Sequence, residues 1–487
     1  MKWLKTLLVV SLVFSLGACS REKGRDLSIL DEEPVEIAKK DLNKHHYTLD
    51  VTLDTEKQTL GGEMNVEVKN NSQDDWQELY LRDYASIITP ESKPTQYKQV
   101  DDGTSDLEVT VDPEDASIVR IDLKTPLKAG TSMKLHINYE SYLVLDAYGR
   151  FNYTSYVQDD KTIGHYTLGN FYPVLSYYED GKWLNHPYYD AGECFYTPVS
   201  DYDVSVTTPK DYTVSATGVL QEEDYFDESV KRVYHEENVR DFGMSAANDY
   251  QVLTDEIDGI TIKSYFSEGT EEAGQIALDE AKNAMQLFNR YLGKYPYQEF
   301  DVASVASLPG SGMEFPGYVM IAERYYSKER MSSMSNIVVH ELAHQWFYGI
   351  VGNDQYDMPW LDESLASVMQ LIYQDYFYPH EYESSVSRFE QKEDSAGEMD
   401  MIVSKSYGEY ADPAIFINAA YSVGQMFMYE VREEMGETDF ISAIKEYVNT
   451  YGYLEAKTEN LIEMLNKWSD HSLLALYQIY LEEQYYQ

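Results

Sequence analysis

Two histidines and a glutamate carry the clearest chemical signal in this sequence. They lie in the run His340-Glu341-Leu-Ala-His344. An i to i+4 spacing places both imidazoles on one face of a helix, where two neutral rings can hold a single cation. Glu341 is turned about a quarter revolution from His340, so it points past the cation toward an open coordination position. The run therefore predicts a metal site with an adjacent base.

A third ligand is required, and the acidic candidate is Glu363. It follows His344 after eighteen intervening residues, in Trp360-Leu-Asp-Glu-Ser-Leu-Ala, which we expect to be a second helix returning antiparallel. Two histidines and one carboxylate leave a fourth position free, as a catalytic zinc site needs and a closed structural site lacks. The alternative is a helix with two core or solvated histidines. We disfavour it because a chance match to the run should arise on the order of once in fifty such sequences.

Two kinds of hydrophobic pattern must position these residues. Alternating segments rich in β-branched and aromatic residues predict strands near 47–53, 63–68, 107–111, 118–123, 133–139, 202–207 and 259–266. Later segments predict strands near 302–307 and 318–322, and helices near 270–292, 333–348, 361–376, 423–435, 440–450, 458–468 and 472–485. The fold class expected is multidomain: an N-terminal all-β saddle or sandwich domain, then an α+β domain.

The first residues predict a secretory signal of the lipoprotein type. Lys2 and Lys5 precede an apolar run, 7–16, that is too short to span a bilayer. The run ends in Leu16-Gly-Ala-Cys19, which resembles a bacterial lipobox, so Cys19 would be lipidated. Two acyl chains give stable attachment to a membrane. We expect a protein of the bacterial cell envelope, lipid-anchored on the extracytoplasmic face of the membrane; an ordinary signal that merely contains a cysteine is the alternative.

The domain organisation expected has four parts. Residues 1–18 are a lipoprotein signal peptide, 19–41 a flexible tether, 42–254 the β domain and 255–487 the catalytic domain. The charge bears on partners, because 85 acidic residues against 38 basic ones give a formal net charge of −47. Such a chain repels nucleic acid, so nucleic-acid binding is excluded as a function.

The motifs together resemble the M1 (gluzincin) family of zinc aminopeptidases, whose hallmark is His-Glu-x-x-His, eighteen residues, then Glu. The metal-binding runs are similar to the family's two metal helices, Ser311-Gly-Met-Glu-Phe-Pro-Gly is similar to its Gly-x-Met-Glu-Asn strand, and Tyr421-Ser-Val-Gly to its Tyr-x-x-Gly segment. The resemblance runs from about Tyr47, strongest over 290–430. It implies a thermolysin-like catalytic domain, one Zn²⁺ per chain held by His340, His344 and Glu363, and hydrolysis by attack of a zinc-bound water.

The resemblance also implies roles for residues that spacing alone would not select. Tyr421 would donate a hydrogen bond to the oxyanion, beside Glu341, which its spacing already makes the candidate catalytic base. Glu314 would bind the substrate's free α-ammonium, and backbone groups around Gly312 and Met313 would align the peptide. The expected substrates are peptides with a free N-terminus.

Departures from the family pattern leave other functions open. Phe315 replaces the family's Asn and would narrow the first subsite or make it more apolar, and Val423 replaces a Lys. The chain ends soon after the catalytic domain, without the large C-terminal helical domain of many relatives, so a more open cleft is expected. The alternatives are a zinc endopeptidase or other hydrolase without amine recognition, and a non-catalytic surface binding protein on a peptidase fold.

Overall fold

Alternating burial builds the first half of the chain. In the computed structural model, strand β1 (His45–Asp54) buries every second side chain, from Tyr47 to Leu53, and β14 (Ser200–Pro209) follows the same alternation. The two strands pair in parallel, and Tyr47 stacks on its partner Tyr202 with ring centroids 4.9 Å apart. The structure describes residues 27–38, 40, 42–88, 91–189, 192, 195–393, 402–410 and 412–486.

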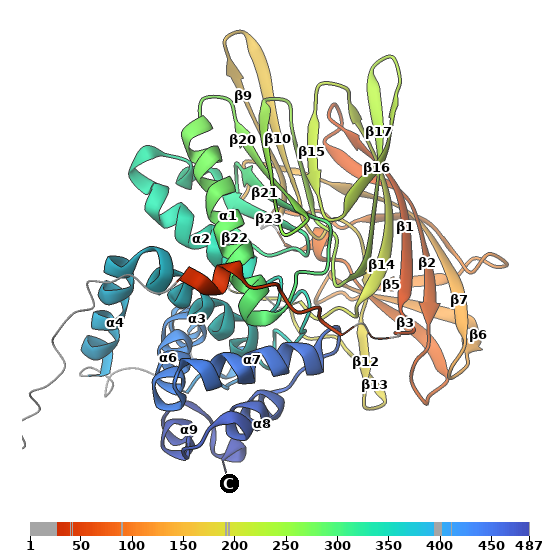
Figure 1. The fold of residues 1–487 in the computed structure, drawn as a ribbon. Helices are drawn as coiled ribbons and strands as arrows, with labels where there is room; N and C mark the ends of the chain where they lie inside the picture. The colour runs from red at the N-terminus through yellow and green to blue at the C-terminus, as the bar shows by residue number, and fades with distance from the viewer. Residues whose placement is uncertain are drawn as a thin grey trace, which may run out of the picture.

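Three larger sheets and a two-stranded ribbon form the N-terminal region (Figure 1). The largest has the order β16-β17-β14-β1-β2-β7-β4, with β16 (Val219–Tyr225), β17 (Ser229–Val239), β2 (Thr59–Lys69), β7 (Ser132–Tyr142) and β4 (Gln96–Asp101). The second has the order β15-β18-β10-β9-β8, with β15 (Thr213–Ala216), β18 (Met244–Ala247), β10 (Lys161–Leu168), β9 (Phe151–Gln158) and β8 (Val144–Leu145). The third is β11-β3-β6-β5, with β11 (Val174–Leu175), β3 (Trp76–Arg82), β6 (Ile118–Leu127) and β5 (Glu108–Val111). The ribbon joins β12 (Tyr177–Glu179) to β13 (Lys182–Leu184).

A mixed five-stranded sheet begins the part of the chain from Tyr250 onward, which we call the catalytic region after the domain expected there. Its order is β19-β20-β21-β23-β22, with β19 (Tyr250–Ile257), β20 (Ile260–Ser267), β21 (Glu299–Val305), β23 (Tyr318–Ala322) and the short edge strand β22 (Gly312–Met313). The domain boundary predicted after Thr254 falls inside β19. Helix α1 (Glu271–Leu292) packs on β19 and β20, and its far side contacts α2 (Met331–Ala343).

Helices make up the rest of the described chain. They gather beside and below α1 in Figure 1. They are α3 (Trp360–Phe377), α4 (Pro379–Glu393), α5 (Pro413–Ile417), α6 (Gly424–Met435), α7 (Glu437–Tyr451), α8 (Thr458–Trp468) and α9 (Leu474–Tyr480). A π-helical turn, Asn418–Val423, joins α5 to α6. No helix among the described residues is long and apolar enough to cross a membrane.

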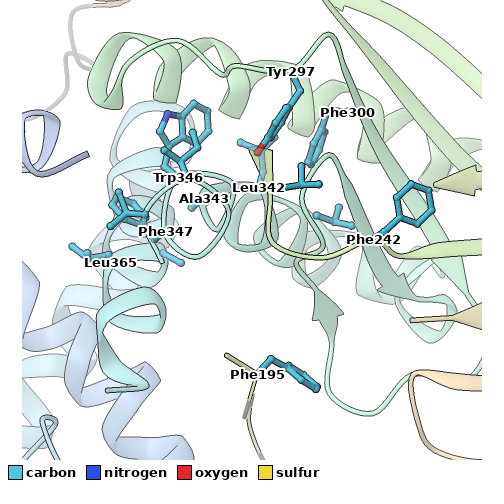
Figure 2. Packing of buried hydrophobic residues seen from close by; sticks show 14 of the residues in the cluster. Phe195, Phe242, Tyr297, Phe300, Leu342, Ala343, Trp346, Phe347 and Leu365 are labelled. Atoms are coloured by element: carbon cyan, nitrogen blue, oxygen red, sulfur yellow. The ribbon is translucent and has the colours of Figure 1, made fainter. Parts of the chain in front are cut away.

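The apolar side of α2 is held in the main hydrophobic core. Leu342, Ala343 and Trp346 belong to one buried cluster with Tyr297 and Phe300 (Figure 2). The indole Nε1 of Trp346 donates to the carbonyl oxygen of Gly293 at the end of α1, over 2.8 Å. Burial on one face therefore fixes which side chains of α2 point away from the core.

Arg240 joins the β region to the catalytic region. It is only 2% exposed, and its Nε donates to the carbonyl oxygen of Tyr348 (2.7 Å) while Nη2 donates to that of Leu454 (2.9 Å). The guanidinium also forms an ion pair with Glu455. A Cβ on Gly352 would lie 2.1 Å from Cζ of Arg240, so only glycine admits the arginine at this point. The two regions are thus packed around a buried charge.

The expected fold class, an all-β region followed by a helical peptidase domain, is confirmed. Two details differ. The segment expected to be a free tether includes a 3₁₀ helix, Leu27–Asp31, and packs on the catalytic region: the amide nitrogen of Lys294 donates to the Val35 carbonyl oxygen and Ile37 is buried. The helix expected over 333–348 ends at Ala343, because the next turns use wider hydrogen bonds such as Gly349 N to His344 O.

Candidate metal centre and active-site cleft

The three expected ligands converge at the facing ends of two helices. His340 lies in the last turn of α2, His344 caps that helix, and Glu363 lies in the first turn of α3. The Nδ1–H group of His344 donates a hydrogen bond to the carbonyl oxygen of Phe347, over 3.0 Å. The lone pair of Nε2 is therefore available to a metal ion. Both helices therefore present a ligand atom to the same point.

The spacing of the ligand atoms fits a tetrahedral metal ion. His340 Nε2 is 3.2 Å from His344 Nε2 and 3.2 Å from Glu363 Oε2, and His344 Nε2 is 3.4 Å from Glu363 Oε2. Ligands about 2.0 Å from a tetrahedral zinc are separated by about 3.3 Å. Two imidazoles and one carboxylate are also ligand types that zinc accepts. The residues present thus fit the metal that the sequence predicted.

The electrostatics of the site favour a positive charge. Burial acts to lower the pKa of His344, yet Glu363, Glu314 and Asp362 raise it well above its usual value. Burial acts to raise the pKa of Glu363, but the two imidazoles reverse this and hold it at about 2. A cation between these groups would replace the proton on His344.

Glu341 faces the cleft and is pressed against the edge strand. It is 6% exposed and lines the cleft, one residue past His340. A Cβ on Gly312 of β22 would lie 2.2 Å from Glu341 Oε1, closer than any real contact. The base predicted from the sequence is therefore held between the ligand helix and β22.

Tyr421 lies on the π-helical turn, next to the ligands Glu363 and His340. Its phenol donates to Glu363 Oε1, and its ring stacks on that of His340 with centroids 6.0 Å apart. Helix α3 fixes the position of the turn, because Ser364 Oγ donates to the Ala420 carbonyl oxygen (3.1 Å). The packing is close here, since a Cβ on Gly424 would lie 1.9 Å from the same Oγ. π-Helical turns commonly occur at functional sites.

Glu314 lies just after β22 and lines the cleft, although it is only 3% exposed. Gln355 Nε2 lies 3.4 Å from Glu314 Oε1 and donates more closely to Asp362 Oδ2, over 2.7 Å. Gly312 lines the cleft as expected. The side chain of Met313 is 2% exposed and belongs to a separate hydrophobic cluster, whereas the role expected for Met313 is that of its backbone.

Three residues near the ligands were missed by the sequence reasoning. Asn353 Nδ2 and Gln355 Nε2 both donate to Asp362, the neighbour of Glu363. Burial and the charge of Glu363 raise the pKa of Asp362 to about 7. The acidic pair Asp362-Glu363 was the available signal, since a second carboxylate beside a ligand needs donors of its own.

The expectation that Phe315 narrows the first subsite is wrong. Phe315 is 1% exposed and is not among the described residues that line the cleft. Its ring fills the space left by two glycines of the β region, since a Cβ on Gly243 or Gly169 would lie 2.5 or 2.8 Å from it. Val423 is likewise fully buried. Both departures from the motif affect packing rather than the shape of the cleft.

The cleft around the ligands has a volume of about 1280 Å³. Both regions line it: Tyr148, Arg150 and Tyr188 come from the β region, and the metal ligands with α3 and α4 from the catalytic region. This volume would hold a peptide of several residues.

Comparison with known proteins matches the same part of the chain to a family model. Residues 276–480 match the Peptidase family M1 domain. Aminopeptidase M1-D of Oryza sativa subsp. japonica is 27% identical over an alignment of 253 residues, which covers 48% of this chain and 29% of that protein. Aminopeptidase 2, mitochondrial, of Saccharomyces cerevisiae is 27% identical over an alignment of 219 residues, which covers 42% of this chain and 23% of that protein.

A third relative matches over a similar share of the chain. Probable aminopeptidase 2 of Sulfurisphaera tokodaii is 24% identical over an alignment of 232 residues, which covers 45% of this chain and 30% of that protein. In each case the matched segment is less than a third of the relative's length. The segment that holds the three expected metal ligands therefore lies within the match to the Peptidase family M1 domain, at residues 276–480.

Proposed function

We propose that the chain is a zinc-dependent aminopeptidase that removes N-terminal residues from peptides. The observation that carries this proposal is the convergence of His340, His344 and Glu363, with Glu341 on one side and Glu314 beyond the edge strand. The names of the relatives support the same activity. When bound to these three ligands, zinc would polarise the peptide carbonyl and lower the pKa of a water molecule.

Glu341 supplies the proton transfers. Its carboxylate accepts the proton of the attacking water and passes it to the leaving amine, as a positioned general base and acid. The contact with Gly312 keeps the carboxylate at one place between the metal ligands and β22, so little reorganisation is needed. The phenol of Tyr421, which reaches Glu363 Oε1, is close enough to donate instead to an oxyanion formed at the carbonyl carbon.

Glu314 supplies the amine specificity. A buried carboxylate that still lines the cleft binds an ammonium group more strongly than an exposed one, because few water molecules compete. The free edge of β22, which ends at Met313 next to Glu314, would align the peptide backbone as an added strand. The N-terminus of the substrate therefore lies at Glu314 and the scissile bond at the metal.

A panel of matched peptides tests this function. Free and N-acetylated versions of one peptide are digested by the wild-type protein, Glu341→Gln and Glu314→Ala, with and without a chelator, and Glu459→Gln on α8 serves as a distant control. We expect cleavage of the free peptide only. Loss of at least about a hundredfold in kcat is expected for Glu341→Gln, with zinc content retained. Equal cleavage of acetylated peptides would show an endopeptidase instead.

The attachment to a membrane is a separate proposal. We propose that the chain is lipidated at Cys19 and held on the extracytoplasmic face of a bacterial membrane; Cys19 lies outside the described residues. The support is the run of apolar residues before Leu16-Gly-Ala-Cys19. Expression in bacteria with labelled palmitate should label the wild-type chain in the membrane fraction. A Cys19→Ser chain labelled to the same degree would contradict the proposal.

A further inference from the structure

One face of α3 forms a polar wall of the cleft. Glu363, Ser367, Gln370 and Gln374 all line the cleft and follow one another at intervals of four, three and four residues. Such intervals place the four side chains in a row along one side of the helix. The row begins at a metal ligand and extends for about 16 Å, at 1.5 Å per residue.

The row continues onto α4 through a chain of hydrogen bonds. Gln374 Nε2 donates to Asn336 Oδ1 (2.8 Å), and Asn336 lies one turn before His340. Ser385 Oγ donates to Gln374 Oε1 (3.2 Å), and Arg388 Nη2 donates to Ser385 Oγ (2.8 Å). Asn336, Ser385 and Arg388 also line the cleft. These bonds hold the amide of Gln374 in a fixed orientation.

The charges in the cleft are divided between its two ends. Its three carboxylates, Glu314, Glu341 and Glu363, lie at the metal end. Among the described residues that line it, Arg150 and Arg388 are the two with cationic side chains. Arg150 is buried, with its guanidinium 4.7 Å from the ring centroid of Phe195, whereas Arg388 is exposed at the end of the polar wall. The chain has a formal net charge of −47. Beyond Glu363, however, the polar wall contains no carboxylate, and this local difference calls for an explanation.

The direction of the wall relates it to the substrate. Glu314 is near the first turn of α3, since Gln355 lies within reach of both Glu314 and Asp362. A peptide with its ammonium group at Glu314 and its scissile bond at the metal must continue away from Glu314. The row from Ser367 to Gln374 leads in that direction.

We propose that this wall binds the part of the peptide beyond the scissile bond, and that Arg388 binds a carboxylate at its far end. An extended chain advances about 3.3 Å per residue, so 16 Å corresponds to about five residues after the cleaved bond. The preferred substrate is then a peptide of about six residues with a free C-terminal carboxylate. The inference rests on the proposed aminopeptidase activity.

A length series with free and amidated C-termini tests the inference. Peptides of one sequence and increasing length are compared with an aminoacyl arylamide, which ends before the wall, and kcat/KM for each peptide is divided by the value for the arylamide. We expect the highest ratio near six residues. Amidation should lower that ratio about tenfold through KM, which corresponds to one lost charge-assisted hydrogen bond. An amidated hexapeptide ending in Asp shows whether a side-chain carboxylate is accepted as well.

Variants locate the effect. Arg388→Gln should remove the difference in the kcat/KM ratio between peptides with a free and an amidated C-terminus. Arg388→Lys should retain part of this difference. Arg120→Gln removes an exposed arginine far from the cleft and should leave the difference intact. Arg388→Gln combined with Gln370→Arg places a cation four residues, about 6 Å, nearer to the metal ligands than the Gln374 end of the wall, so the preferred length should fall by about two residues.

Two results would overturn different statements. Equal ratios for acid and amide in the wild-type protein, or an equal decrease for both in Arg388→Gln, would contradict the role of Arg388 while leaving the aminopeptidase activity in place. A wild-type protein that cleaves neither the arylamide nor any free peptide would contradict the proposed function itself, and this inference with it.

Discussion

The carboxylate of Glu341 lies directly against the backbone of Gly312, so that a methyl group on Gly312 would be 2.2 Å from Oε1. The position of the Glu341 carboxylate therefore depends on the absence of a side chain at Gly312. A side chain at Gly312 must therefore displace Glu341, even though Gly312 has an ordinary backbone conformation and no positive φ.

Gly312→Ala should displace the Glu341 carboxylate and lower kcat by about a hundredfold, as a shift of about 1 Å commonly does. Zinc content should be unchanged, because none of the three ligands touches the new methyl group. Steady-state kinetics with metal analysis of the same samples checks both points. A variant with the kcat of the wild-type protein would contradict the contact.

Gly424→Ala should disturb Tyr421 through Ser364. The added Cβ would lie 1.9 Å from Ser364 Oγ, so the π-helical turn or α3 must shift, and overpacking of this kind costs about 1–3 kcal/mol. The exchange Ser364→Gly with Gly424→Ala removes the clash and should recover most of the stability in a thermal melt. If the single variant melts with the wild-type protein, the close packing is incorrect.

Arg240→Ala should destabilise the whole chain, because it leaves the carboxylate of Glu455 buried without its cation. Breaking such a pair costs about 3–5 kcal/mol. The double variant Arg240→Ala with Glu455→Ala should be less destabilised than the sum of the two single variants. Denaturant unfolding measures all three, and strictly additive values would argue against the ion pair.

The pH dependence of stability should include a contribution from Asp241. Burial raises the pKa of Asp241 to about 7 in the folded chain, from an ordinary value of 3.8 when unfolded. The folded state therefore binds more protons between these values, so the free energy of unfolding falls as the pH rises from about 4 to about 7. The slope is on the order of 1 kcal/mol per pH unit.

Asp241→Asn should make this slope shallower. The amide can still accept from the phenol of Tyr172 and from the backbone nitrogen of Phe242, which bond to Oδ1 at 2.9 and 2.7 Å. Unfolding in denaturant at about pH 5 and about pH 7 compares the two proteins. An unchanged slope would show that other buried carboxyl groups, such as Asp301, account for the dependence.

Regular patterns made much of the fold predictable. β1 and β14 alternate buried and exposed side chains along their length, and α1 and α3 have continuous apolar faces, so period alone identified them. Strand β18 was missed because all four of its residues are buried and show no alternation. Helix α4 was missed because it starts at a proline and is rich in polar residues.

The residues of the candidate site also differ in whether the sequence could predict them. His340, Glu341, His344 and Glu363 could be selected from spacing because a helix converts sequence intervals into shared faces. The bonds from Asn353 and Gln355 to Asp362 could not, since they depend on how the loop before α3 returns past the ligands. The side-chain direction of Phe315 depends on two glycines more than seventy positions away in the sequence.

The π-helical turn that carries Tyr421 makes the position of its phenol sensitive to the deletion of a single codon. One extra residue per turn is accommodated between Asn418 and Val423, and the surplus is confined to that turn by Ser364 and Gly424. Loss of a single codon there would restore ordinary helical hydrogen bonding and rotate the residues on one side by about 100° relative to the other. A chain without that residue would keep His340, His344 and Glu363 but place the phenol elsewhere.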